Sequence, residues 1–257
     1  MQNNDFMIKQ NNGVKYYISR SLERLGFVKH FFSTRIGGVS EVPFDSLNLG
    51  IYTEDKYENI NKNYSRIFEA ADMDGQNMVY LRQVHGDCFY IVNDDNRKEI
   101  IGKDGDALIT TSKNIPIGVM TADCIPVIIV DSLKRAAAVV HAGWKGTHLH
   151  IVDKVVRYMM DNLGARAEYI TAVVGPGIGP CCFEVKEDVA EKFTFVEKRN
   201  CSYFVDLWQE NKKQLINLGV RNIIHEPLCT ICMEDNFFSY RRDGKITGRM
   251  ATFIEIT

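Results

Sequence analysis

A run of four strand-like segments without a helix between them constrains the fold of this chain most. The segments are DALITT (106–111), IPIGVMTA (115–122), IPVIIVD (125–131) and AAAVVHA (136–142). Their β-branched residues favour strands, and Gly, Pro, Asn and Asp separate them. Consecutive strands argue against the regular strand–helix alternation of a doubly wound parallel sheet. The order predicts a mixed α/β sandwich.

The remaining segments agree with this class. Further strand-like stretches are VKYYIS (14–19), VKHFFST (28–34), MVYLRQV (78–84), CFYIV (88–92), YITAVVG (169–175) and RMATFIEI (249–256). Helical periodicity covers 55–71, 147–163, 186–193 and 206–218. No linker-like tract interrupts the 257 residues, and 45% hydrophobic content suffices for a sizeable core. We therefore expect a single domain over 1–257.

Charge and cysteine content narrow the partners and the compartment. Acidic and basic residues nearly balance at a net charge of -2, which disfavours nucleic acid and anionic membranes and favours a small-molecule substrate. The chain lacks a signal-like N-terminus and any apolar run of about 20 residues, so we expect a cytoplasmic protein without a membrane partner. Its 7 cysteines indicate reduced thiols, some of which are candidate ligands or nucleophiles.

A Cys-His-His set stands at the ends of three apolar segments. Cys124 precedes one strand, His141 ends the next, and His85 follows a third in RQVHGD. If the first two strands pair antiparallel, Cys124 and His141 lie close together. Catalytic zinc commonly takes three such ligands and leaves a fourth position open. The separations match no short metal motif, so buried core residues are the alternative interpretation, but Gly86 and Gly143 beside the histidines indicate close backbone approach.

Two other cysteine-containing segments give weaker signals. GPGIGPCCFEV (175–185) is too rich in proline for a dinucleotide-binding turn, and its adjacent cysteines are either reactive or buried without a role. PLCTIC (227–232) carries a CxxC that resembles half of a zinc deaminase motif, but no glutamate follows His141 to complete it. Local packing is the simpler interpretation of both segments. We likewise interpret His148 and His150 in THLHI as structural.

Arginines beside glycines are candidate anion ligands. Arg35 lies in STRIGGVS, and Arg241, Arg242 and Arg249 lie in YRRDGKITGRM. A guanidinium group binds phosphate or carboxylate in a bidentate manner, and neighbouring glycines permit close approach. We select Arg35 as the candidate phosphate ligand and expect the others to be surface residues.

Several motifs in a fixed order resemble those of a known family. STRIGGVS, LNLG, RQVHG, DALIT, TADCIPVIIVD, VVHAGWKGT, GPGIGPCCFEV and SYRRDGKITGRMA are similar to the YfiH-like family, also called the laccase-domain or polyphenol oxidase family. The resemblance runs from about residue 31 to the C-terminus. It implies an α/β/β/α layered fold and a metal bound by His85, Cys124 and His141, with zinc as the expected ion and copper as the other candidate.

The resemblance also implies an activity. Members of the family are described as purine nucleoside phosphorylases, which cleave adenosine, inosine and S-methyl-5'-thioadenosine with phosphate, and as adenosine deaminases. Two alternatives stay open: a cysteine-type hydrolase or amidase that edits peptidoglycan precursors, with Cys124 as the nucleophile and His85 or His141 as its base, and a non-catalytic nucleoside-binding protein. Only 6 histidines occur, too few for a full multicopper oxidase site.

Overall fold

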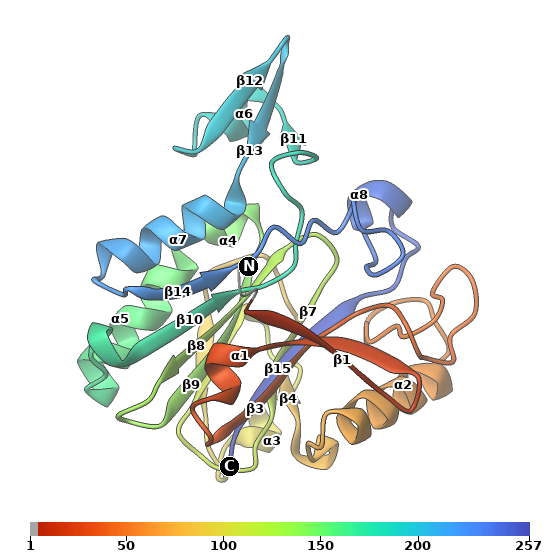
Figure 1. Ribbon diagram of the computed structural model, residues 1–257, viewed down its shortest axis with the longest axis vertical. Helices are drawn as coiled ribbons and strands as arrows, with labels where there is room; N and C mark the ends of the chain where they lie inside the picture. Colours follow the sequence, from red (N-terminus) through yellow and green to blue (C-terminus); the bar gives the residue numbers. More distant parts are fainter. Residues whose placement is uncertain (1–4) are drawn as a thin grey trace.

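The computed structural model describes residues 5–257, whose strands form two six-stranded sheets and one three-stranded sheet (Figure 1). The first large sheet contains, in spatial order, β1 (Phe6–Asn11), β2 (Val14–Ser19), β3 (Val28–Ser33), β15 (Met250–Ile256), β7 (Ile117–Thr121) and β4 (Val79–Tyr80). Its neighbouring strands are antiparallel except for the parallel pair of β4 and β7. The sheet is therefore mixed, as expected.

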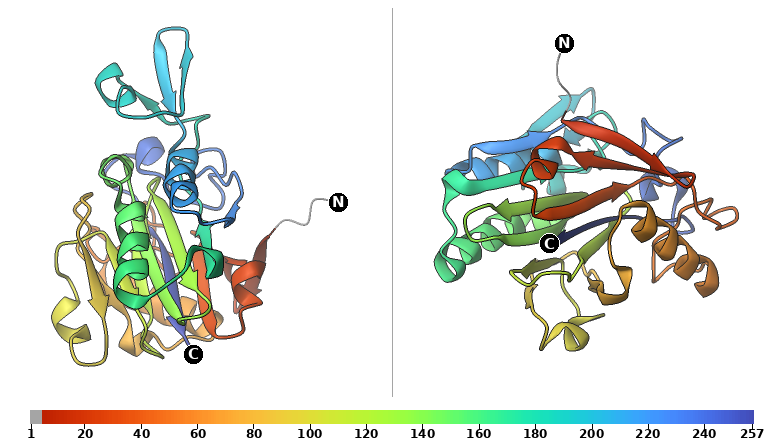
Figure 2. Two further views of the ribbon diagram at one scale, coloured as in Figure 1. Left: turned by 90° about the vertical axis from the view of Figure 1, so that its left-hand side faces the viewer. Right: turned by 60° about the horizontal axis from the view of Figure 1, so that its bottom comes forward.

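The second large sheet contains three of the four consecutive strand segments, and the other one, β7, belongs to the first sheet. Its spatial order is β14 (Asn222–His225), β10 (Ile170–Val174), β8 (Ile125–Asp131), β9 (Ala136–Ala142), β6 (Ala107–Thr110) and β5 (Phe89–Val92). β10 and β14 run parallel, as do β5 and β6. The small sheet, β11 (Glu184–Val185), β13 (Ser202–Val205) and β12 (Val196–Arg199), projects from the body in Figure 1 and in the left view of Figure 2.

Helices cover the outer faces of both large sheets. α2 (Tyr57–Ala70) packs on the first sheet, and α5 (Ile151–Leu163) and α7 (Leu207–Asn217) pack on the second (Figure 1). The remaining helices are short: α1 (Arg20–Glu23), α3 (Arg97–Ile100), α4 (Trp144–His148), α6 (Glu187–Ala190), α8 (Tyr240–Asp243), η1 (Gly75–Asn77) and η2 (Ala167–Tyr169). This α/β/β/α arrangement confirms the expected fold. Within residues 5–257 no helix has the length and apolar character needed to cross a bilayer.

The alternation of side chains along β8 explains the layers. Val127 and Ile129 belong to the core beneath α5, whereas Ile128 and Val130 belong to the core between the two sheets. Successive residues of a strand face opposite sides, so a strand buried on both faces is an unbroken apolar run. That is why IPVIIVD is apolar up to Asp131, and β8 lies inside the sheet between β10 and β9.

Sequence and structure differ in a few elements. Each of the ten strand-like segments contains a strand, but β1 and β11 to β14 were not anticipated, because their residues are short runs or mixed with charge. The expected helix over 147–163 is broken: α4 ends at His148, and His150 adopts a left-handed backbone with φ of 61° before α5 begins. His148 and His150 are both exposed; His148 ends α4, and His150 lies between the two helices as the N-cap of α5.

Candidate functional site

His85, Cys124 and His141 converge at one end of the second sheet. Their ligand atoms all lie within 4.8 Å of one another. β8 and β9 pair antiparallel, with Ile125 opposite Ala142 and Pro126 opposite His141, so Cys124, directly before β8, lies beside His141 near the end of β9. The pairing expected from the sequence is confirmed. His85 comes from the loop between β4 and β5.

Asp106, which the sequence analysis missed, holds this cluster together. It directly precedes β6 and is fully buried. Its carboxylate accepts hydrogen bonds from the backbone N–H groups of His85 (3.0 Å) and Gly86 (2.7 Å), and its Oδ1 lies 2.7 Å from His141 Nδ1. A carboxylate bonded to Nδ1 fixes the orientation of the ring and leaves Nε2 of His141 available as a ligand atom. The only signal in the sequence was an acidic residue at the start of a buried strand.

The backbone at the cluster is strained. His85 has a φ of 58° and Asp123 a φ of 89°, in the left-handed region that residues other than glycine rarely adopt. Each such residue costs about 1–3 kcal/mol and persists only where its surroundings impose it. Asp123 is held by the Thr230 hydroxyl, which donates to Oδ1 (2.6 Å), and by the Arg241 backbone N–H, which donates to Oδ2 (2.7 Å). Such strain next to Cys124 is typical of a functional site.

Gly143 leaves the space in which the donors meet. A Cβ at this position would lie 2.9 Å from Cys124 Sγ and 3.1 Å from His85 Cδ2. Both distances are below normal van der Waals contact, so a larger residue would displace the ligand atoms. The close approach expected at Gly143 is therefore made by the cluster itself. Gly86, in contrast, has no neighbour nearer than 3.5 Å to such a Cβ.

The charges of the cluster favour an anionic sulfur. Burial raises the pKa of the Cys124 thiol, but the neighbouring His141 and His85 outweigh burial and lower this pKa to about 6. Burial lowers the pKa of His141, but the Cys124 thiolate and Asp106 outweigh it and raise this pKa to about 9. Thiolate and imidazole are the donors that zinc and copper favour. The donor set, with the space left by Gly143, fits a metal ion.

The cluster opens into a cavity of about 630 Å³, a size suited to a small molecule. Three cationic side chains line it, Lys145, Arg241 and Arg249. Aromatic and apolar side chains form much of the remaining wall: Tyr52, Leu81, Met120, Trp144, Ile178, Phe183 and Tyr240. The cavity thus combines anion-binding groups with surfaces on which a flat ring can pack.

Arg249 is the cationic group best placed to bind an anion. It lies against the cavity in an environment that lowers its pKa through burial. Within residues 5–257, its side-chain hydrogen bonds all use Nη1, which donates to Thr247 O (2.7 Å) and Gly248 O (2.8 Å). These bonds fix the guanidinium and leave Nε and Nη2 for a ligand. Arg241 also lines the cavity, with its guanidinium 5.4 Å from the centre of the Phe183 ring.

Arg35, the residue selected from the sequence, lies in a different cavity. That cavity of about 560 Å³ is also lined by Arg242 and Asp243 and shares no residue with the site of the metal donors. The Arg35 guanidinium is already engaged: Nη2 lies 3.2 Å from Asp45 Oδ2, and the group stacks 4.7 Å from the centre of the Phe238 ring. The structure therefore places Arg35 away from the cluster, whereas Arg241 and Arg249 line the cavity into which the cluster opens.

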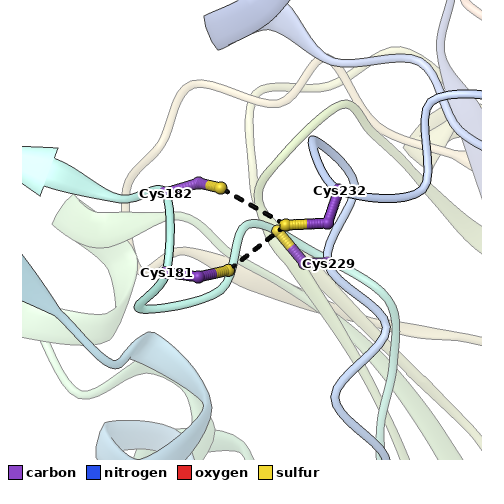
Figure 3. A group of neighbouring side chains, drawn as sticks. All are labelled: Cys181, Cys182, Cys229 and Cys232. Atoms are coloured by element: carbon purple, nitrogen blue, oxygen red, sulfur yellow. Dashed lines mark hydrogen bonds between the residues drawn. The ribbon is translucent and has the colours of Figure 1, made fainter.

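A second group of possible metal donors was missed altogether. Cys181 and Cys182 of one loop meet Cys229 and Cys232 of another, and the four sulfur atoms lie within 4.8 Å of one another (Figure 3). Taken alone, adjacent cysteines and a lone CxxC are weak signals, and 46 residues separate Cys182 from Cys229 in the sequence. Only the tertiary structure joins them.

Comparison with known proteins agrees with the resemblance noted in the sequence. The family model described as multi-copper polyphenol oxidoreductase laccase matches residues 29–257. The Escherichia coli (strain K12) protein named purine nucleoside phosphorylase YfiH is 38% identical over 231 residues, which cover 86% of this chain and 91% of the relative. A Bacteroides thetaiotaomicron purine nucleoside phosphorylase is 31% identical over 255 residues, covering 92% and 94% of the two chains.

Solved structures show the same architecture. YlmD from Geobacillus stearothermophilus superposes with a TM-score of 0.91 at 28% identity, covering 98% of this chain and 99% of that one. The hypothetical protein YfiH from Bacillus licheniformis gives a TM-score of 0.90 at 31% identity, covering 97% and 99%. With this likeness over nearly its whole length, the chain belongs to the laccase-like polyphenol oxidase family that includes the YfiH proteins.

Proposed function

We propose that this protein is a metal-dependent purine nucleoside phosphorylase that acts on adenosine, inosine and S-methyl-5'-thioadenosine. The observation that carries the proposal is the convergence of His85, Cys124 and His141 in a cavity lined by cationic and aromatic side chains. The names of the relatives from Escherichia coli and Bacteroides thetaiotaomicron support it.

His85, Cys124 and His141 would hold the metal, with zinc as the expected ion and copper as the alternative. When bound, such an ion supplies a positive charge that stabilises negative charge developing on the substrate. Asp106 keeps the His141 ring oriented through Nδ1 and fixes the backbone of His85, so that both imidazoles are preorganised.

The cationic side chains of the cavity would bind the phosphate. Arg249 presents Nε and Nη2 as a fork for two phosphate oxygens, and Arg241 and Lys145 add positive charge. In phosphorolysis a phosphate oxygen attacks the anomeric carbon of the sugar, the bond from that carbon to the purine nitrogen breaks, and its electron pair leaves with the base. Fixed positive groups orient the phosphate and lower the barrier to this displacement.

The aromatic wall would receive the nucleoside. Trp144, Phe183 and Tyr240 offer ring faces and apolar edges on which a purine packs. Packing of this kind tolerates changes at the purine exocyclic group and at the 5' position of the sugar, in agreement with a substrate range that includes inosine and S-methyl-5'-thioadenosine.

Adenosine deamination belongs to the proposal as a second reaction of the same cavity. It requires a group that transfers protons between water and the purine ring. Asp123 lines the cavity next to Cys124, but its two carboxylate oxygens already accept hydrogen bonds from Thr230 and Arg241. We therefore expect deamination to be the slower of the two reactions.

One observation favours a second candidate, a cysteine-type hydrolase or amidase that edits peptidoglycan precursors. Cys124, His141 and Asp106 form a thiol–imidazole–carboxylate series like that of cysteine hydrolases, and the pKa of the thiol is lowered to about 6. The same three residues serve either chemistry, so only an experiment separates them. The third candidate function is that of a protein that binds nucleosides in this cavity without catalysing a reaction.

The decisive experiment measures metal content and reaction products of the purified protein. With adenosine and phosphate we expect free adenine and ribose 1-phosphate, loss of the activity on chelation, and its return on addition of zinc. Cys124→Ala should lose its activity together with the zinc ion that His85, Cys124 and His141 hold. Full activity of the metal-free wild type on an amide substrate would favour the hydrolase, and the absence of any product would favour the binding protein.

A further inference from the structure

The cysteine pairs described above lie on loops that leave the same edge of the second sheet. β10 and β14 run side by side in parallel, so the loops that follow them begin together. Cys181 and Cys182 lie in the first loop, and Cys229 and Cys232 in the second. A short bridge pairs Gly177 with Cys229: Gly177 N–H donates to Leu228 O (3.2 Å), and Thr230 N–H donates to Gly177 O (3.0 Å).

The spacing of the four sulfur atoms suits a single tetrahedral ion. Cys181 Sγ and Cys182 Sγ each lie 3.5 Å from Cys232 Sγ, and all four atoms lie within 4.8 Å of one another (Figure 3). Zinc–thiolate bonds of about 2.3 Å in a tetrahedron place the sulfurs about 3.8 Å apart. An iron–sulfur cluster places several irons and sulfides between its thiolates and separates some of them further. The observed group is compact enough for one ion.

Backbone hydrogen bonds to one sulfur provide a second, independent observation. Gly179 N–H donates to Cys229 Sγ at 3.3 Å, and the backbone N–H groups of Ile231 and Cys232 also donate to it. Several N–H donors around one sulfur stabilise a thiolate, which is the form that binds metal. Cys229 itself is buried, while its three partners reach toward the surface, which gives an ion a route of entry.

We propose that Cys181, Cys182, Cys229 and Cys232 bind one zinc ion in a tetrathiolate site, separate from the centre formed by His85, Cys124 and His141. Four soft thiolates select zinc over hard cations. Since the protein supplies all four ligands, no position is left for substrate, and the site is structural. The two candidate centres share no residue.

The proposed ion clamps one wall of the substrate cavity. Thr230 lies between Cys229 and Cys232, and its hydroxyl donates to Asp123, the residue before Cys124. On the other loop, Ile178 N–H donates to Asp123 O (2.8 Å), and Ile178 lines the cavity. The tetrathiolate site therefore fixes the two loops that hold Asp123 in its strained backbone. Its loss is expected to raise KM for nucleoside severalfold.

The test is the zinc content of the purified full-length chain, measured by mass spectrometry of the metal. We expect two zinc ions per wild-type chain, one in Cys232→Ser, one in His141→Ala, and none in the double variant. Cys201→Ser is the matched control, since Cys201 is exposed outside both groups, and it should keep two. One zinc per wild-type chain, lost completely in His141→Ala, would overturn this site while leaving the proposed function intact.

A second measurement avoids variants of these cysteines, in case they do not fold. X-ray absorption at the zinc edge of His141→Ala should show four sulfur neighbours at about 2.3 Å. Nitrogen or oxygen neighbours, an equivalent of iron instead of zinc, or a disulfide among the four cysteines in non-reducing peptide mapping would each contradict the proposal. The zinc content of the wild-type chain tests the proposal even if none of the variants folds.

Discussion

At the scale of single residues, Gly143 determines whether the metal donors can meet. Its backbone is extended, with φ of -68° and ψ of 170°, so any residue can adopt it and only the added Cβ matters. That Cβ would contact Cys124 Sγ and His85 Cδ2. We expect Gly143→Ala to weaken zinc binding at this centre at least tenfold, about 1.4 kcal/mol, and to reduce phosphorolysis in proportion. Chelator competition measures the affinity.

Gly86→Ala is the matched control for this prediction. Gly86 follows His85, but a Cβ there meets atoms only at 3.5 Å and beyond, in ordinary contact. The control should bind zinc as the wild type does. Unchanged zinc affinity in Gly143→Ala would mean that the donors do not converge as described.

Two arginines differ in their expected roles: Arg249 lines the cavity of the His85, Cys124 and His141 cluster, whereas Arg35, selected from the sequence, lines another cavity. Arg249→Gln should raise KM for phosphate at least tenfold, because Nε and Nη2 of Arg249 are the unengaged fork in the cavity. Arg35→Gln should change this KM less than twofold, since Arg35 pairs with Asp45 in another cavity. Phosphate titrations at saturating adenosine measure both. Equal effects of the two variants would contradict the assignment of Arg249.

At the scale of secondary structure elements, Asp106 connects three segments of the chain at the candidate metal site. It directly precedes β6, its carboxylate bonds to His141 on β9, and it accepts a hydrogen bond from the loop that carries His85. Asp106→Asn would place an NH2 group where a carboxylate oxygen now accepts hydrogen bonds from N–H donors. We expect zinc affinity to fall about 10–100-fold, as for other partners of metal ligands, with the fold retained.

Asp104→Asn is the control for Asp106, two residues away. Asp104 is exposed and pairs with Arg82 at the surface. Exposed ion pairs contribute about 0–1 kcal/mol, so this variant should keep its zinc and its activity. A loss of zinc in Asp104→Asn equal to that in Asp106→Asn would show that the region tolerates no substitution, and the role of Asp106 would then have no support.

Local elements could be predicted from the sequence, whereas contacts between distant elements could not. The β8–β9 hairpin is a pair of apolar runs joined by a short turn, so the proximity of Cys124 and His141 followed from local pattern. The cysteine group depends on β14, whose residues NIIH are too few and too polar to predict a strand. Its parallel pairing with β10 is a long-range contact that no local pattern specifies. The placement of Asp106 and Arg249 depends in the same way on tertiary packing.

At the scale of the whole molecule, a buried carboxyl group in the first sheet makes stability depend on pH. Glu255 on β15 is 4% exposed between neighbouring strands, and within the described chain its Oε2 has no hydrogen-bond partner. Burial raises the pKa of its carboxyl to about 7, assisted by Asp74 and Asp72 and opposed by Lys29 on β3. Folding therefore favours the protonated form. The charged form is destabilising.

The sign of the effect follows from the two pKa values. Below the ordinary pKa of about 4.5 the carboxyl is protonated in both states, and burial costs no charge. As the pH rises toward 7 the unfolded chain releases the proton first, so stability falls, and above 7 the whole cost of up to about 3 kcal/mol remains.

Glu255→Gln should thus match the wild type near pH 4.5 and exceed its free energy of unfolding by up to about 3 kcal/mol near pH 8. Denaturant titrations at both pH values measure this gap, with exposed Glu191→Gln as the control. A gap that stays constant with pH would mean that Glu255 ionises normally in the folded protein.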